Sequence, residues 1–250
     1  MKTIEDIIKR GWNIHRDLME SPEKKAFLVR GSIPILWFGD MEAYKKSERK
    51  IVTVGLNPSL KEFPEDLDRF PLAAGLHSKA TLSSKDVEAY TNAMNAYFET
   101  KPYTKWFNHF EKALNPLEAS YYAKPQMPNR AIHIDIYTPI ATDPTWSGLS
   151  PEQKKYIDEQ SNGLYEDLLT LLKPDVVLVS ANSAVVKEQF PIAFKAYLGD
   201  ADKGSHYLRV GKTKSGCVVI WGFNNISGPF SIKEETLKEK LMQIKKDYKL

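Results

Sequence analysis

The chain has 250 residues, of which 42% are hydrophobic and 27% charged, and its formal net charge is +3. This composition is typical of a soluble globular protein, and the single cysteine, Cys217, excludes a disulfide framework, a cysteine-based zinc site and a four-cysteine iron–sulfur cluster. No apolar run approaches the ~18 residues of a membrane span, and the first six residues lack the apolar core of a signal peptide. We therefore expect a cytoplasmic protein with no membrane partner.

Capping residues and apolar periodicity predict helices along the chain. The first covers much of residues 4–20, within an N-terminal helical extension of about residues 1–30, and the second begins at Ser84. The third begins at Ser150-Pro151, with Pro at the first helical position, and runs to about Leu172. A capping box at residues 231–234 predicts the start of the last helix at Ser231.

Short runs rich in β-branched residues predict the strands. They cover residues 33–38, 50–55, 131–137, 175–180 and 217–222. Strands separated by helical segments predict a parallel sheet covered on both sides. These patterns predict a single α/β domain over residues 1–250, with a parallel sheet flanked by helices.

Small polar residues follow four of these strands. Asn57, Asp135, Asn182 and Asn225 lie at or just beyond the strand ends, where open α/β sheets bind ligands. Motifs for a dinucleotide fold, a P-loop or a hydrolase elbow are absent, and the five histidines lack metal-ligand spacing. We expect a polar pocket that uses neither a metal nor another cofactor.

Two segments resemble the motifs of one enzyme superfamily. Gly55-Leu56-Asn57-Pro58-Ser59 is similar to the first motif of the uracil-DNA glycosylase superfamily, and the segment from Asn225 to Ser231 is similar to its second. The pair of asparagines is nearest the mismatch-specific uracil/thymine branch. Ile226 departs from the pattern, since Pro is usual there, and the loop is one residue longer around residues 228–230. The resemblance covers roughly residues 33–245, and the fold it implies is a three-layer sandwich with a central, mainly parallel four-stranded sheet flanked by helices.

The resemblance implies a monofunctional DNA glycosylase that acts as a monomer on double-stranded DNA. Such an enzyme flips a base out of the stack and hydrolyses its N-glycosidic bond, which leaves an abasic site. Two alternatives stay open: a non-catalytic DNA-binding protein on the same fold, and a hydrolase of nucleosides or other small molecules.

The resemblance also implies catalytic roles. Asn57 would orient the attacking water, although its amide cannot act as a general base, and Asn225 would donate a hydrogen bond to the departing base. Asp135 would read the base or help to place the water. The alternatives are a turn residue that caps Pro58 for Asn57, and a strand-end acid paired with an arginine for Asp135.

The same comparison implies DNA and substrate contacts. Ser227 and Ser231 would hold phosphates, and Ser231 would also cap the last helix. Pro229 or Phe230 would be the apolar wedge that replaces the flipped base, and Phe70 would stack on that base. The alternative for Phe230 is a core residue of the last helix, and the alternative for Phe70 is a packed loop aromatic. The remaining expected contacts are Gly55, Leu56, Pro58, Ser59, Asn182 and Gly228.

Ser59 bears on the choice of substrate. The uracil-specific branch carries a tyrosine here that excludes substituents at the pyrimidine C5, whereas serine leaves that position open. Hypoxanthine, mismatched thymine and bulky modified pyrimidines of phage DNA are therefore admissible, and both DNA repair and antiviral defence are open as roles. Candidate contacts to the DNA backbone are Lys61, Lys79, Lys187, Arg209, Lys212 and Lys214.

Overall fold

A computed structural model describes residues 2–20, 26–161, 163–200, 206–225 and 228–250. The chain divides into two compact units whose segments alternate along the sequence. Unit 1 comprises Met1–Gly39, Leu56–Pro102 and Ile134–Lys173, and unit 2 comprises Asp40–Gly55, Tyr103–His133 and Pro174–Leu250. Across the described ranges, no helix combines the length and the apolar character that crossing a membrane requires.

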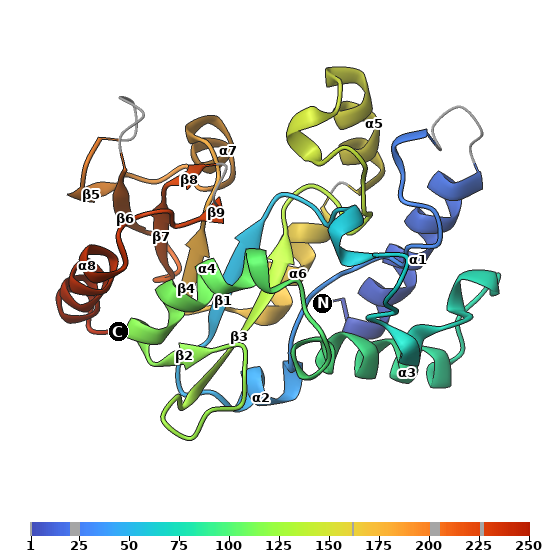
Figure 1. Cartoon of the computed structure of the whole chain (residues 1–250), viewed down its shortest axis with the longest axis horizontal. Coiled ribbons are helices and arrows are strands. Elements are labelled where there is room, and N and C mark those ends of the chain that lie inside the picture. Colours follow the sequence, from blue (N-terminus) through green and yellow to red (C-terminus); the bar gives the residue numbers. More distant parts are fainter. Residues whose placement is uncertain (1, 21–25, 162, 201–205, 226–227) are drawn as a thin grey trace. The chain divides into compact units, whose positions relative to one another are not determined.

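Unit 2 is built on the sheet (Figure 1). Seven strands pair within the described residues, in the order β2-β3-β1-β4-β7-β6-β5. β4 pairs in parallel with both β1 and β7, whereas β6 is antiparallel to β7 and β5. The strands are β1 (Ile51–Gly55), β2 (Ala119–Ser120), β3 (Asn129–Asp135), β4 (Val176–Val179), β5 (Lys195–Leu198), β6 (Leu208–Lys212) and β7 (Val218–Gly222).

The α/β class is confirmed, but the prediction of four strands is wrong. The four predicted strands from residue 50 onward are the adjacent strands β3, β1, β4 and β7. The sheet is larger and mixed because β6 returns against β7 through a turn at Gly216, whose φ is 96°. β5 then extends the antiparallel edge. The three-layer arrangement and the single domain stay predictions.

The strand predicted at residues 33–38 does not form. The segment is buried, but it joins no strand ladder. Its polar backbone groups bond elsewhere: the Ile35 N–H donates to the Pro139 carbonyl at 2.8 Å, and Tyr90 OH lies 3.1 Å from the Leu36 nitrogen. Pro34 has no N–H to offer a neighbouring strand. Apolar β-branched composition here reflects burial without pairing.

Unit 2 also contains α2 (Met41–Lys46), α4 (Thr104–Leu114), α7 (Ser183–Gln189) and α8 (Glu234–Tyr248). The predicted start of the last helix at Ser231 is wrong. The helix begins at Glu234, and its N-cap, Lys233, makes no side-chain cap bond. The Ser231 hydroxyl instead donates to the Gly228 carbonyl, which holds the preceding turn together.

Unit 1 contains α1 (Ile4–Glu20), α3 (Ser84–Asn95), α5 (Pro151–Ser161) and α6 (Leu164–Leu172). α1 confirms the first predicted helix, while α3 is capped by Ser83 rather than beginning from a cap at Ser84. The single helix predicted from Ser150 to Leu172 is two helices. Gly163 lies between them with a φ of 77°, a conformation that ends a right-handed helix.

Candidate active site

The first-motif loop is fixed against the loop that follows β3, and both lie in unit 1. The Tyr137 N–H donates to the Leu56 carbonyl at 3.0 Å. Further on, the Thr142 N–H donates to the Pro58 carbonyl at 3.2 Å, and the Leu60 N–H donates to the Thr142 carbonyl at 3.3 Å. These main-chain bonds bring the predicted residues Leu56 and Pro58 beside the loop of Asp135.

Asn57 is held by the same loop through its side chain. Its Nδ2 donates to Thr142 Oγ1 at 2.9 Å and to the Ile140 carbonyl at 3.5 Å. These bonds occupy the amide hydrogens and leave Oδ1 as the atom that accepts a hydrogen bond. The amide therefore links two loops, which differs from the alternative of a residue that caps Pro58.

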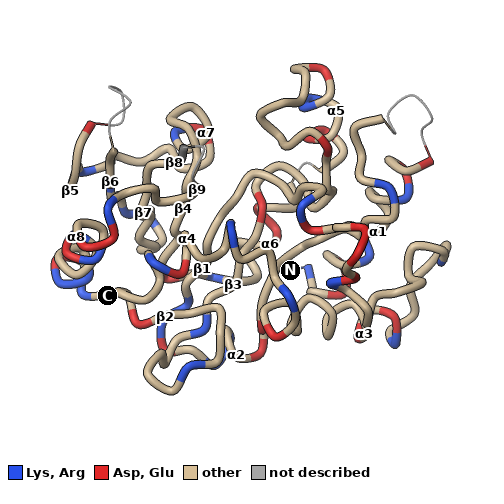
Figure 2. The backbone as a smooth tube through the Cα atoms, in the orientation of Figure 1, with Lys and Arg blue, Asp and Glu red and all other residues tan. Residues whose placement is uncertain are grey.

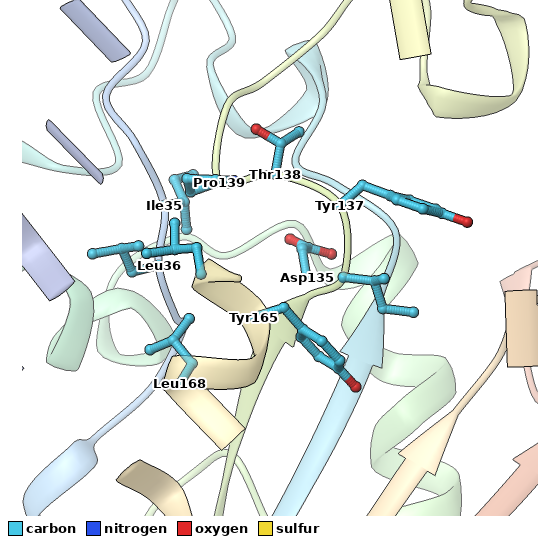
Figure 3. A pocket seen from close by; sticks show the side chains of 10 residues that line it. Ile35, Leu36, Asp135, Tyr137, Thr138, Pro139, Tyr165 and Leu168 are labelled. Atoms are coloured by element: carbon cyan, nitrogen blue, oxygen red, sulfur yellow. The ribbon is translucent and has the colours of Figure 1, made fainter. Parts of the chain in front are cut away.

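Asp135 ends β3 and is half-buried beside a small cavity. The cavity has a volume of about 10 Å³, which is room for about one water molecule and far too little for a nucleobase. Figure 3 shows the Asp135 carboxylate among the lining side chains, with Thr138 and Tyr165 nearby. The roles predicted for Asp135, in base recognition, water placement or an arginine pair, stay predictions.

Ser59 begins a short 3-10 turn, η2 (Leu60–Glu62), directly after the motif. Its Oγ accepts a hydrogen bond from the Lys61 N–H at 3.3 Å. This cap is the local reason that the chain turns inward and buries Glu62, which is 5% exposed. The cap explains a serine at this position, and the open C5 gate stays a prediction.

Glu62 is the functional candidate that sequence reasoning missed. Tyr97 OH donates to its Oε2 at 2.5 Å, and Arg69 Nη1 lies 3.7 Å from the same oxygen. Burial raises the pKa of Glu62 to about 7; the Tyr97 hydrogen bond and Arg69 oppose this rise, and the charge of Asp135 adds to it. The only feature of the sequence that points to this turn is Ser59, a capping residue three positions before Glu62.

Aromatic side chains pack around this carboxyl group. Phe70 is 4% exposed, and its ring centroid lies 5.7 Å from that of Tyr97 at an interplanar angle of 20°. Phe63 lies against Phe70 at 5.5 Å. The structure thus shows Phe70 in the packed arrangement that was the alternative to base stacking.

A second aromatic pair lies on the loop after β3. Tyr137 and Trp146 stack with centroids 4.2 Å apart and planes 8° apart. Tyr137 is half-buried and also lines the cavity beside Asp135, whereas Trp146 is buried. Sequence analysis did not single out either ring, since an isolated Tyr and Trp nine residues apart carry no spacing signal.

The second motif forms a short hairpin in unit 2, after β7. It consists of β8 (Asn224–Asn225) and β9 (Gly228–Pro229), which pair antiparallel. The hairpin is tied to the end of β4 through Ser180, whose Oγ donates to the Phe223 carbonyl at 3.2 Å and accepts from the Phe230 N–H at 3.3 Å. The backbone of Asn225 is described, and Ser227 lies outside the described residues.

The two wedge candidates are buried in unit 2. Phe230 is 2% exposed and packs on Phe110, with ring centroids 5.8 Å apart. A Cβ at Gly222 would lie 2.2 Å from the Phe230 ring, so only glycine allows this packing. Pro229 is also buried. Phe230 is thus a core residue, but it precedes α8, which begins at Glu234, and is not part of the last helix.

Gly228 approaches α4 closely. Its φ is 123°, and a Cβ there would lie 2.6 Å from the ring of His109. Burial lowers the pKa of His109, and the nearby Lys112 lowers it further, so the imidazole beside the second motif is neutral at pH 7.

The remaining predicted residues have identifiable structural places. Asn182 is exposed and caps α7, where its Oδ1 accepts from the Val185 N–H at 3.1 Å. Gly55 is the buried last residue of β1. Asn57 belongs to unit 1 and Asn225 to unit 2, and the expected common cavity of the two asparagines stays a prediction.

Comparison with known proteins gives no match, either to a protein-family model or to a curated sequence. Within the described residues, no group of three or more His, Cys, Asp or Glu side chains is placed to hold a metal ion. The functional argument therefore depends on the geometry of the site and on the two sequence motifs.

Proposed function

We propose that this protein is a DNA glycosylase that hydrolyses the N-glycosidic bond of a flipped base. One observation carries the proposal: the amide of Asn57 is held by Thr142 Oγ1 and the Ile140 carbonyl, so that Oδ1 is left to accept a hydrogen from the attacking water. This is the task that the resemblance assigns to the asparagine of the first motif.

The order of the strands supports the proposal. β1 leads directly into the first motif, and β7 leads into the hairpin of the second. Both strands run parallel to β4, which lies between them, so they share the direction of their carboxyl ends. In the proposal, the four adjacent strands β3, β1, β4 and β7 are the uracil-DNA glycosylase-like core, and the antiparallel strands are an addition at its edge.

The proposed chemistry needs charge placement rather than a strong nucleophile. The sugar becomes cation-like as the bond to the base breaks, and negative charge collects on the base. Asn57 is assigned the orientation of the water, and Asp135 is assigned the acceptance of its proton, which an amide cannot take. Asn225 is assigned the hydrogen bond to the departing base. The cavity beside Asp135 is assigned to water because it is too small for a base.

The proposed substrate class follows from Ser59. A small side chain at this position admits a substituent at the pyrimidine C5, so substrates beyond uracil fit the proposal, including mismatched thymine and bulky modified pyrimidines of phage DNA. Repair and defence are two uses of the same chemistry.

A panel of duplexes tests the proposal. Each duplex carries one uracil, mismatched thymine, hypoxanthine or 5-substituted cytosine, and an unmodified duplex is the control. Free base is measured by mass spectrometry, and abasic sites are measured by strand breaks after alkali. We expect base release from at least one modified duplex. Binding without release would favour a non-catalytic DNA-binding protein, and cleavage of free nucleosides alone would favour a small-molecule hydrolase.

A further inference from the structure

Leu60 is an exposed leucine directly after the first motif. Among the described residues, three large hydrophobic side chains are exposed: Leu60 at 40%, Leu72 at 53% and Met242 at 50%. Single exposed apolar side chains are ordinary on protein surfaces, so exposure alone assigns no role to any of them. What distinguishes Leu60 is the way in which its backbone is fixed beside Asn57.

One residue holds both Leu60 and Asn57. The Leu60 N–H donates to the Thr142 carbonyl at 3.3 Å, and Asn57 Nδ2 donates to Thr142 Oγ1 at 2.9 Å. Ser59, which lies between them in the chain, forms a parallel β-bridge with the same threonine. All four residues belong to unit 1. The leucine is therefore fixed to the same support as the amide that the proposed reaction uses.

The turn that carries Leu60 is also braced from a second segment. The Lys61 carbonyl accepts a hydrogen bond from Arg69 Nη1, and Arg69 Nε donates to the Lys101 carbonyl at 2.6 Å. Glu62, which ends the turn, is only 5% exposed. Because a 3-10 turn has three residues per turn, a buried Glu62 places Leu60 on a different face. The backbone is thus held on both sides, and the leucine side chain is presented to solvent.

A base that flips out of DNA leaves a gap in the stack, and apolar side chains such as leucine can fill it. The resemblance offers Pro229 or Phe230 for this role, but both side chains are buried in unit 2. A wedge has to be apolar, exposed and rigidly joined to the residues that act on the flipped nucleotide. Leu60 meets these three conditions.

We propose that Leu60 is the wedge, and that it enters the base stack at the position that the flipped nucleotide leaves. This inference rests on the proposed glycosylase function. Lys61, the next residue, is exposed, and its ammonium group is placed to pair with a phosphate beside the gap. One turn then serves both steps, since Asn57 orients the water while Leu60 keeps the nucleotide out of the stack. The wedge acts on duplex DNA, because a single strand has little stacking to oppose the flip.

Single-turnover base release from a duplex and from its lesion-bearing single strand tests this role. Leu60→Ala should slow release from the duplex by about 10–100-fold, because the cost of unstacking is no longer offset. Release from the single strand should change by less than about twofold. Leu60→Met keeps an apolar side chain of similar length and should retain most of the duplex rate. A cooperative urea transition like that of the wild type verifies that each variant is folded.

Leu72→Ala is the matched control. Leu72 is an exposed leucine in the next 3-10 turn of the same segment, η3 (Pro71–Ala73), so the substitution removes the same side chain from a similar surface. It should leave the duplex and single-strand rates unchanged. A loss of duplex activity in Leu72→Ala equal to that in Leu60→Ala would overturn the assignment of the wedge to Leu60.

A binding measurement that does not depend on activity separates the two proposals. A duplex with a tetrahydrofuran abasic analogue already contains the gap, so the wild type should bind it more tightly than the intact duplex. Leu60→Ala should reduce this preference by at least about fivefold, and Leu72→Ala should keep it. Equal preferences and equal duplex rates for Leu60→Ala and the wild type would overturn the inference and leave the glycosylase function intact. A preference that depends on Leu60, in a protein that releases no base from any substrate, would instead overturn the proposed function and support a DNA-binding protein with this wedge.

Discussion

Both amide hydrogens of Asn57 point to oxygens of one loop, at Thr142 Oγ1 and at the Ile140 carbonyl. Thr142 is fully buried, and its backbone also bonds to Pro58 and Leu60. The threonine thus fixes both the position of the first-motif loop and the direction of its amide. Orientation of this kind contributes to catalysis without any new contact to the substrate.

Thr142→Val should separate these two effects. Valine keeps the shape and the backbone bonds but removes the acceptor for Asn57 Nδ2, so the amide loses its fixed direction. We expect base release to slow by about tenfold with DNA affinity unchanged. Thr145→Val, at an exposed position of the same loop, is the matched control. Equal rates for Thr142→Val and the wild type would show that the bond is not needed for catalysis.

His15 makes a prediction about stability. It is 4% exposed, and burial lowers its pKa from 6.5 to about 4. Its pKa is therefore lower in the folded state than in the unfolded state. Between these two pKa values the unfolded chain binds more protons than the folded chain. The free energy of unfolding therefore decreases as the pH is lowered through this range. From pH 7 to pH 4.5 we expect His15 to remove about 2–3 kcal/mol.

Urea unfolding of the wild type and His15→Gln at pH 7 and pH 4.5 measures this effect. Other groups titrate in the same range, so the informative quantity is the difference between the two proteins in their loss of stability. The wild type should lose more stability than the variant. Identical losses would show that His15 is protonated without cost in the folded protein.

At the scale of elements, composition predicted the positions of helices and buried strands more reliably than it predicted which segments pair within the sheet. β1, β3, β4 and β7 each overlap a predicted strand. Residues 33–38 have a similar composition but bond to a loop and to Tyr90 OH, which no local pattern encodes. The hairpin of β6 and β7 was missed because Leu-Arg-Val-Gly-Lys has a short and interrupted apolar pattern.

The β8–β9 hairpin depends on a glycine for two separate reasons. Gly228 has a φ of 123°, and a Cβ there would lie 2.6 Å from the His109 ring. We expect Gly228→Ala to lower the free energy of unfolding by about 1–3 kcal/mol. Adding His109→Ala should recover only part of the loss, because it removes the clash but not the backbone strain. Chemical denaturation of the single and double variants measures the contribution of the clash and that of the backbone strain. A Gly228→Ala protein as stable as the wild type would contradict the observed close approach.

The candidate site was predictable where it depends on strand order and unpredictable where it depends on burial. Asn57 follows β1 and Asp135 ends β3, and the structure brings the loops after these strands together. Glu62 resembles any solvated acid in its local sequence, Lys61-Glu62-Phe63. It is buried against Tyr97, which is 35 residues further along the chain, and beside Arg69 of the same segment. Long-range packing of this kind leaves no periodic signal in a single sequence.

At the scale of the whole molecule, charge is distributed rather than concentrated. Lys and Arg are interspersed with Asp and Glu in both units, and α8 carries both signs (Figure 2). Affinity for DNA would then come from a limited number of phosphate contacts, and it should weaken as salt rises. Among the predicted contacts, Lys212 and Lys214 are exposed at the turn between β6 and β7.

Replacing both of these lysines with alanine should reduce the slope of log affinity against log salt by about 2. Base release at saturating DNA should be unchanged, because neither lysine belongs to the proposed catalytic site. The paired control is Lys238→Ala with Lys246→Ala on α8, which changes the net charge equally at exposed positions. Equal salt slopes for the two double variants would show that the β6–β7 turn does not contact DNA.

The most direct test is the single-turnover rate of base release by the wild type and by Asn57→Ala, measured on the best duplex of the panel with DNA affinity determined in parallel. We predict that the variant binds DNA as the wild type does and releases the base about 10²–10³-fold more slowly. Equal rates in the two proteins would contradict the assignment of Asn57 to the attacking water.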